Sequence, residues 1–312
     1  MRMDWRLGTR VLKWLGRAAG GLAALGLTAA APAPAPVAHV AAAQAARPGL
    51  WKLADKDTTI YLFGTIHALP DGVAWRTPTF DRAFASADEL MIEVGNIDDQ
   101  QAVAGALMKT GMAPGLPPIL ERVPEAKRAA LKAAIGESGV PDAAFDRMKS
   151  WMAAVLLLST ELKKIGLDPE HGVERALVAE WKAKGRSVSG FETAEQQFGF
   201  LDSLSPDAQA KLLASAADKK EAMAKEFAGM LAAWKAGDTA AIARTFDDET
   251  NMSAELRDRL MKQRNARWAD WLAARMAKPG TVFVAVGAGH LAGPDSVQAM
   301  LAAKGLKAVR VQ

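Results

Sequence analysis

Two of the chain's four histidines share one sequence context. Each follows an apolar run and has a glycine three positions before it: Gly64 precedes His67 in IYLFGTIHALP, and Gly287 precedes His290 in VFVAVGAGHLAGP. Imidazole binds metal ions and transfers protons near neutral pH, and glycine allows a backbone to turn tightly or to approach a ligand closely. One such histidine alone is more often structural, but two in the same context indicate a functional pair.

A glutamate occurs inside another apolar run. Glu93 lies in ELMIEV, residues 89–94, which has the composition of a buried strand. An unpaired, ionised carboxylate in such a place costs several kcal/mol. Glu93 is therefore expected to be paired with a lysine or arginine, to be protonated, or to bind a cation.

An arginine occupies the apolar face of a predicted helix. Arg264 follows Leu260 by four residues and precedes Trp268 by four, so helical periodicity places all three on one stripe. Two interpretations are open. Either the stem packs while the guanidinium reaches solvent, or the guanidinium pairs with an acid or stabilises an anionic intermediate. A buried acid such as Glu93 in the same chain favours the second, and Asn265 follows directly.

Three other polar residues carry weaker signals. Glu192 follows a short predicted strand and is either a cap or turn residue or a chemical one. His171 lies in the polar turn DPEHG and is expected to be exposed, and His39 lies in an Ala/Pro-rich segment.

The elements that must position these residues form two similar units. Each unit is a strand, a GxxH turn, a helix begun near a proline and a second strand. Runs without polar alternation favour parallel strands, and ligands bind at the carboxyl ends of such strands, where both histidines would lie. The predicted positions are Thr58–Phe63, Thr77-Pro78 and Glu89–Val94 in the first unit, and Val282–Val286, Pro294 and Leu306–Val311 in the second.

The middle of the chain is mainly helical by its periodicity, with one strand candidate at Ser187–Phe191. The sequence predicts an α/β fold, a mainly parallel sheet built from N- and C-terminal βαβ-like units. A large helical insertion at about 98–186 forms a cap or second layer within a single domain, 49–312. The predicted helical segments are Glu121–Ile135, Ala143–Ile165, Val173–Lys184, Pro206–Lys235 and Ser253–Met276.

The net charge of +4 is confined to the start of the chain, where residues 1–46 hold five basic residues and one acid. The remainder is close to neutral, so no nucleic-acid partner is expected. The basic opening and the short apolar run Ala18–Ala31 are typical of a signal peptide at 1–31, followed by a flexible Ala/Pro-rich linker at 32–48. We expect a periplasmic or secreted protein that meets the membrane only through this signal.

The chain has no cysteine. Disulfides, a lipid-modified cysteine and thiolate metal ligands are excluded, so any metal would be held mainly by His, Asp or Glu. The motif HExxH is also absent from the sequence, which excludes the helix-borne zincin arrangement.

Several of these motifs together resemble one known family. From about Trp51 to Val311 the chain is similar to the TraB/GumN family, which includes the TIKI metalloproteases. The likeness rests on GTIH, Glu93, SGFET at 189–193, AWKAGD at 233–238, the Arg264-Asn265 pair and VGAGHLAGPDSV at 286–297.

The resemblance implies a domain of the erythromycin-esterase/ChaN-like kind and, in the TIKI branch, peptide cleavage that depends on a divalent metal. His67, His290 and Glu93 match the residues that would hold the cation, which would be Mn, Co or Zn, and Glu93 is either a ligand or the general base. Arg264 and Asn265 match the family's RN pair, with Arg264 stabilising an oxyanion or orienting Glu93. The mid-chain turn departs from the pattern, because Glu174 follows Gly172 where relatives often carry aspartate.

The expected function is therefore that of an exported, divalent-metal-dependent hydrolase acting on a peptide or protein substrate. The alternative is a binding protein in which the same residues hold haem or a metal without hydrolysis, as ChaN-like relatives suggest. A third interpretation is a catalytically silent surface or assembly protein.

Overall fold

The computed structural model describes residues 46–217, 220–247 and 252–312. The predicted signal peptide (1–31) and most of the predicted linker (32–48) lie outside the described residues. Ala46–Gln312 forms one compact unit. In the described part of the chain, no helix combines the length and the apolar character needed to cross a membrane.

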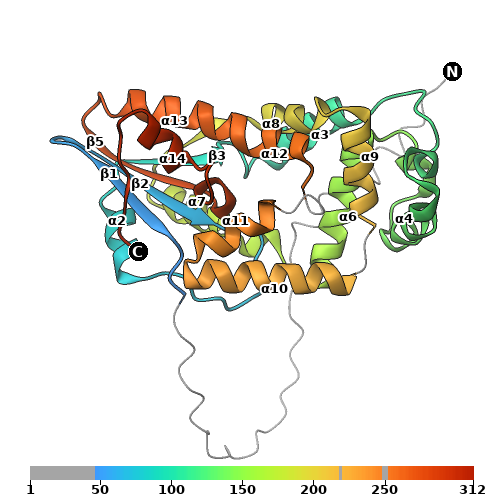
Figure 1. The fold of residues 1–312 in the computed structure, drawn as a ribbon, viewed down its shortest axis with the longest axis horizontal. Coiled ribbons are helices and arrows are strands. Elements are labelled where there is room, and N and C mark those ends of the chain that lie inside the picture. Colours follow the sequence, from blue (N-terminus) through green and yellow to red (C-terminus); the bar gives the residue numbers. More distant parts are fainter. Residues whose placement is uncertain (1–45, 218–219, 248–251) are drawn as a thin grey trace, which may run out of the picture. The chain divides into compact units, whose positions relative to one another are not determined.

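A six-stranded sheet lies at the centre of this unit, in the order β4-β3-β5-β2-β1-β6. The pairs β2·β5, β5·β3 and β3·β4 are parallel, whereas β1 is antiparallel to both its neighbours. The predicted α/β fold with a mainly parallel sheet is therefore confirmed (Figure 1). The strands are β1 Leu50–Ala54, β2 Thr58–Thr65, β3 Glu89–Val94, β4 Val188–Glu192, β5 Gly280–Gly287 and β6 Val309–Arg310.

The strand register brings the two ends of the sequence together. Strand β2 pairs with β5 over its whole length, with Thr65 opposite Gly287 at the carboxyl end. On the other side of β5, β3 ends at the same edge of the sheet, and its Val94 lies opposite Glu192 of β4. The residues that follow β2 and β5, together with the last residues of β3 and β4, therefore share one edge.

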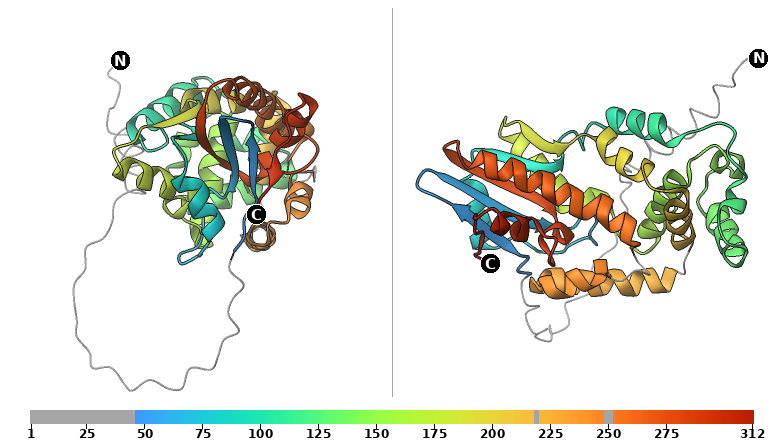
Figure 2. Two further views of the ribbon diagram at one scale, coloured as in Figure 1. Left: turned by 90° about the vertical axis from the view of Figure 1, so that its left-hand side faces the viewer. Right: turned by 45° about the horizontal axis from the view of Figure 1, so that its top comes forward.

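Helices cover both faces of the sheet, as two views of the ribbon show (Figure 2). On one face, Phe63 and Phe283 pack against aromatic residues of α2 (Pro78–Ala85) and against α7 (Val173–Ala183). On the other, alternate residues of β5 pack against α13 (Gln263–Arg275) and α14 (Val297–Ala303). Because both faces of the sheet are buried, the sequences of its strands are nearly continuous apolar runs.

The remaining helices lie between β3 and β5, on both sides of β4 in the sequence. Between β3 and β4 they are α3 Gln100–Gly111, η1 Ile119–Arg122, α4 Glu125–Glu137, α5 Asp142–Phe145, α6 Ser150–Lys164 and η2 Pro169–His171. Between β4 and β5 they are α8 Ala194–Asp202, α9 Pro206–Ser215, α10 Lys220–Ala236, α11 Thr239–Asp247, α12 Ala254–Arg257 and η3 Asp258–Lys262. A last short turn, η4, spans Ala288–Leu291.

Candidate metal centre at the carboxyl edge of the sheet

The predicted site residues come from four separate parts of the chain and meet at the carboxyl edge of the sheet. His67 follows β2, Glu93 belongs to β3, and His290 lies in η4 directly after β5. Arg264 and Asn265 lie in the first turn of α13. Two further glutamates join them, Glu174 in the first turn of α7 and Glu192 at the end of β4, and neither was a predicted site residue.

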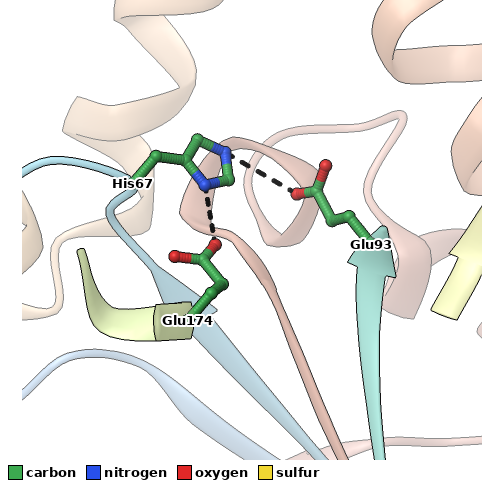
Figure 3. Close-up of side chains that lie close together, drawn as sticks. All are labelled: His67, Glu93 and Glu174. Atoms are coloured by element: carbon green, nitrogen blue, oxygen red, sulfur yellow. Dashed lines mark ion pairs between the residues drawn. The ribbon is translucent and has the colours of Figure 1, made fainter. Parts of the chain in front are cut away.

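His67 is oriented by Glu174. The imidazole Nδ1 lies 2.8 Å from Glu174 Oε1 (Figure 3), and the Thr65 hydroxyl donates to the same oxygen. The backbone fixes this pairing, because Val173 N donates to Ile66 O at 3.0 Å. A β carbon on Gly172 would lie only 2.2 Å from the His67 carbonyl oxygen, so glycine is needed for this close approach.

Glu93 is held through both of its carboxylate oxygens. Gly287 N donates to Oε1 at 2.7 Å, and Arg264 Nη2 donates to Oε2 at 2.7 Å. Oε1 also faces His67 Nε2 at 3.9 Å, and a β carbon on Gly287 would lie 3.1 Å from this oxygen and 3.2 Å from His67 Nε2. The glycine therefore leaves space beside Glu93 and His67.

Arg264 is buried and fully paired, so its guanidinium does not reach solvent. Its Nε lies 3.0 Å from both carboxylate oxygens of Glu192, while Nη2 binds Glu93. Its Nη1 donates to Leu260 O at 3.0 Å. The helix has a π-helical turn just before this residue, with Gln263 N bonded to Asp258 O. Such turns change which side chains share a face of the helix, and here the turn leads directly into the residue that joins two glutamates.

His290 is buried and neutral. Asn265 Nδ2 donates to Asp295 O at 2.7 Å, so Asn265 Oδ1 is left to accept a hydrogen bond. It accepts from His290 Nδ1–H, and the two atoms lie 2.6 Å apart. Nε2 of His290 then accepts from Arg264 Nη1 at 3.1 Å. Burial lowers the pKa of His290 to about 3, which agrees with this neutral tautomer.

The two histidines of the site have pKa values shifted in opposite directions. The Glu174 carboxylate raises the pKa of His67 to about 9 against the opposing effect of desolvation. Burial favours the neutral form of Glu93, but the Arg264 guanidinium, the His67 imidazolium and the Gly287 N–H outweigh it and hold the pKa of this carboxyl well below its usual range. Near neutral pH, His67 therefore carries a proton that balances a neighbouring buried carboxylate.

The group that best fits a cation is His67, Glu93 and Glu174. Each of these residues offers one ligand atom, and the three atoms lie within 4.8 Å of one another. Glu174 Oε2 is buried and has no hydrogen-bond partner among the described residues, a cost that a cation would remove. His290 Nε2 lies 3.6 Å from Glu93 Oε1 but accepts a hydrogen bond from Arg264, which occupies its lone pair.

Two cavities meet at His67 and Glu93. A larger one, of about 510 Å³, is lined mainly by apolar side chains and ends at the site. A smaller one, of about 200 Å³, lies against Glu174 and Arg175. The side chain of His67 is 62% exposed, so the site is open to a ligand although its acids are buried.

The fold and site define a class of α/β protein in which histidines after neighbouring parallel strands meet a strand glutamate and a buried arginine. Within that class, the chain belongs to the TraB/PrgY/gumN family, whose sequence model matches residues 49–310.

The chain is also similar to the uncharacterized protein YbaP of Escherichia coli (strain K12) and of Shigella flexneri. It is 28% identical to each over 245 residues, which cover 77% of this chain and 87% of either relative. No solved structure matches.

Proposed function

We propose that the protein is a divalent-metal-dependent hydrolase that cleaves an amide or ester bond at the His67–Glu93 edge. One observation carries the proposal: an accessible imidazole and two buried glutamates converge at the point where two cavities meet. Family membership supports the proposal but does not specify an activity.

His67 and Glu93 are the ligands in this proposal. His67 donates Nδ1–H to Glu174, which leaves Nε2 free to bind a metal on the side that faces Glu93. An imidazole nitrogen and a carboxylate oxygen are ligand types that suit Zn, Mn or Co. When bound, such an ion polarises a carbonyl and makes water a better nucleophile at neutral pH.

The other residues set the charge and direction of these ligands. Arg264 holds Glu93 ionised and in place, which suits Glu93 to the role of ligand more than to that of general base. His290 would become a ligand only by giving up its hydrogen bond from Arg264, so we assign it to orienting the guanidinium, with Asn265 fixing its tautomer.

The test is a calorimetric titration of the purified, chelator-treated protein with Zn²⁺, Mn²⁺ and Co²⁺. We expect one equivalent of at least one cation to bind, and binding to be lost in His67→Ala because that variant lacks the accessible nitrogen ligand. His171→Ala is the matched control, since His171 is exposed and lies outside the site. Unchanged stoichiometry in His67→Ala would overturn the proposed metal site.

Hydrolysis is then measured on amide and ester substrates with the same cation. We expect turnover that stops with chelator, returns with the cation and is missing in His67→Ala. Cation binding without turnover would favour the binding-protein alternative, as would a Soret band on addition of haem.

A further inference from the structure

We propose that the substrate is an N-acyl amino acid whose aliphatic acyl chain fills the larger cavity and whose carboxylate lies in the smaller one. This inference rests on the proposed hydrolase function for its chemistry, but its binding step is testable separately. The scissile amide would lie at His67 and Glu93, which line both cavities.

The larger cavity has the size and lining of a small-molecule site. Its volume of about 510 Å³ lies within the usual range for ligand pockets. Its walls come mainly from α6, α8, α10, α11 and η3. Prominent among the wall residues are Phe198, Leu201, Phe227, Met230, Phe246 and Met261. Methionines adapt their shape to an apolar ligand at little cost.

The walls favour an aliphatic chain over a peptide. Most polar side chains that line the cavity belong to the site, and the others are Gln197, which also lines the smaller cavity, and the Trp234 indole. Trp234 Nε1 already donates to Gly64 O at 2.8 Å, and the Thr65 hydroxyl is bonded to Glu174. A peptide in this cavity would leave its backbone amides without partners, which is costly, whereas an acyl chain has no polar groups to satisfy.

The smaller cavity favours an amino acid as the leaving group. Its volume of about 200 Å³ suits a small residue, and its charged lining is Arg175 with His67, Glu93 and Glu174. Glu93 is paired with Arg264 and Glu174 with His67, so Arg175 is the cation left for a ligand carboxylate. The Arg175 guanidinium pairs with the exposed Glu170 at 3.3 Å, and its side chain is 28% exposed, so it retains donors for a ligand carboxylate. The larger cavity is therefore apolar, like an acyl chain, whereas the smaller one offers a cationic group that suits the carboxylate of an amino acid.

The reaction is a balanced hydrolysis. The oxygen of water bonds to the acyl carbon, the carbon–nitrogen bond breaks, and both protons of water end on the departing nitrogen. The products are a carboxylate and an amino acid with a free ammonium group.

Binding is tested by calorimetry in the chelator-treated protein, with N-decanoylglycine, N-octanoylglycine and N-acetylglycine as probes. Because each buried methylene contributes about 0.8 kcal/mol, removing two should weaken binding roughly tenfold, and N-acetylglycine should bind far more weakly still. Equal affinity across the three probes would overturn the acyl-chain assignment.

Two variants locate the two ends of the probe. Met230→Trp fills the larger cavity and should weaken N-decanoylglycine binding at least tenfold, while Met223→Trp, seven residues earlier on α10 and outside the cavity lining, should not. Arg175→Ala should weaken N-decanoylglycine but not N-decanoylglycinamide, which lacks the carboxylate. If Arg175→Ala affects both probes equally, the amino acid assignment is wrong.

These measurements separate the two proposals. Chain-length-dependent binding without cation-dependent turnover would leave the cavity assignment standing and remove the hydrolase. Cation-dependent turnover of amides with no preference for acyl length would support the hydrolase and remove the cavity assignment.

Discussion

At the scale of single residues, the site is organised by the exchange of a proton for a cation at His67. In the metal-free protein, the proton on His67 is stabilised by the charge of Glu174. A metal ion at Nε2 must displace that proton, so the carboxylate that orients the ligand also makes the proton compete harder with the metal. The balance between them is set by pH.

The first residue-scale prediction concerns the proton on His67, which competes with the metal ion. In Glu174→Gln the amide oxygen still accepts from Nδ1, but the negative charge is gone, so the pKa of His67 should fall from about 9 towards 6.5. NMR titration of the imidazole in chelator-treated protein measures the change. Glu170→Gln is the control, because that carboxylate pairs with Arg175. An unshifted pKa in Glu174→Gln would show that Glu174 does not set it.

The same pair predicts a pH dependence of stability and of metal affinity. Because the folded-state pKa of His67 is raised from 6.5 to about 9, its contribution to metal-free stability is complete below about pH 6.5 and is lost as the pH rises through about 9. Cation affinity should rise over the same window, since the competing proton leaves. Denaturant unfolding and calorimetry at several pH values check both trends. A cation affinity that is constant from pH 6.5 to 9 would contradict the assignment of His67 as a ligand.

Much of the site could be read from the sequence at this scale, because buried charge is conspicuous in an apolar run. Glu93 and Arg264 were expected to meet, and they do, at 2.7 Å. Glu174 and Glu192 could not be identified in the same way. Both lie at element ends, where a glutamate is ordinarily a cap or a solvated residue. The pairing of β4 with β3 places Glu192 near Arg264, and the contact of α7 with the residues after β2 places Glu174 against His67.

At the scale of elements, the ends of strands were easier to predict than the ends of helices. Strands β2, β3 and β5 lie where the apolar runs placed them, within two residues. The segment predicted as one helix from Pro206 to Lys235 contains two, α9 and α10, and β1 was not predicted because its five residues are interrupted by a lysine. The spacing of apolar residues indicates which side chains are buried, whereas the break between α9 and α10 and the formation of β1 depend on contacts distant in sequence.

The element-scale prediction concerns the turn that begins α7. Gly172→Ala should destabilise the protein by about 1–3 kcal/mol, because the added carbon would overlap the His67 carbonyl and force the turn away. Cation affinity should fall at least tenfold as His67 moves. Thermal unfolding and calorimetry measure the two effects.

The matched control is Gly136→Ala, at a helical glycine of α4 where an added Cβ would meet no atom within 4 Å. That change should raise stability by about 0.5–1 kcal/mol through helix propensity and leave cation affinity unchanged. Equal effects of the two substitutions would refute the close-approach argument.

At the scale of the whole molecule, the site joins parts of the chain that are remote in sequence. The proposed ligands lie just after β2 and near the end of β3, two strands that are joined only through β5, and Glu174 of α7 orients one of them. A cation bound there links two strands of the sheet directly and, through the His67–Glu174 pair, the helix that covers one face. The stability of the entire compact unit should therefore respond to the metal.

The whole-molecule prediction is a shift of the single unfolding transition. A cation at about 100 times its dissociation constant adds about 2.7 kcal/mol, which for a chain of this size corresponds to roughly 5–10 °C in Tm. Calorimetric scans with cation and with chelator measure the shift, and His67→Ala should show none. A shift that persists in His67→Ala would place the cation elsewhere.

The central position of β5 also constrains how the protein is made. During synthesis the β1–β2 hairpin and the strand β3 leave the ribosome early, but the strand that joins them comes from residues 280–287, more than 200 positions after β2. Until then, the nascent chain holds two partial sheets with open edges, which are prone to pair with other chains. Contacts of such long range slow folding, so this protein should depend on chaperones until about its last tenth has been translated.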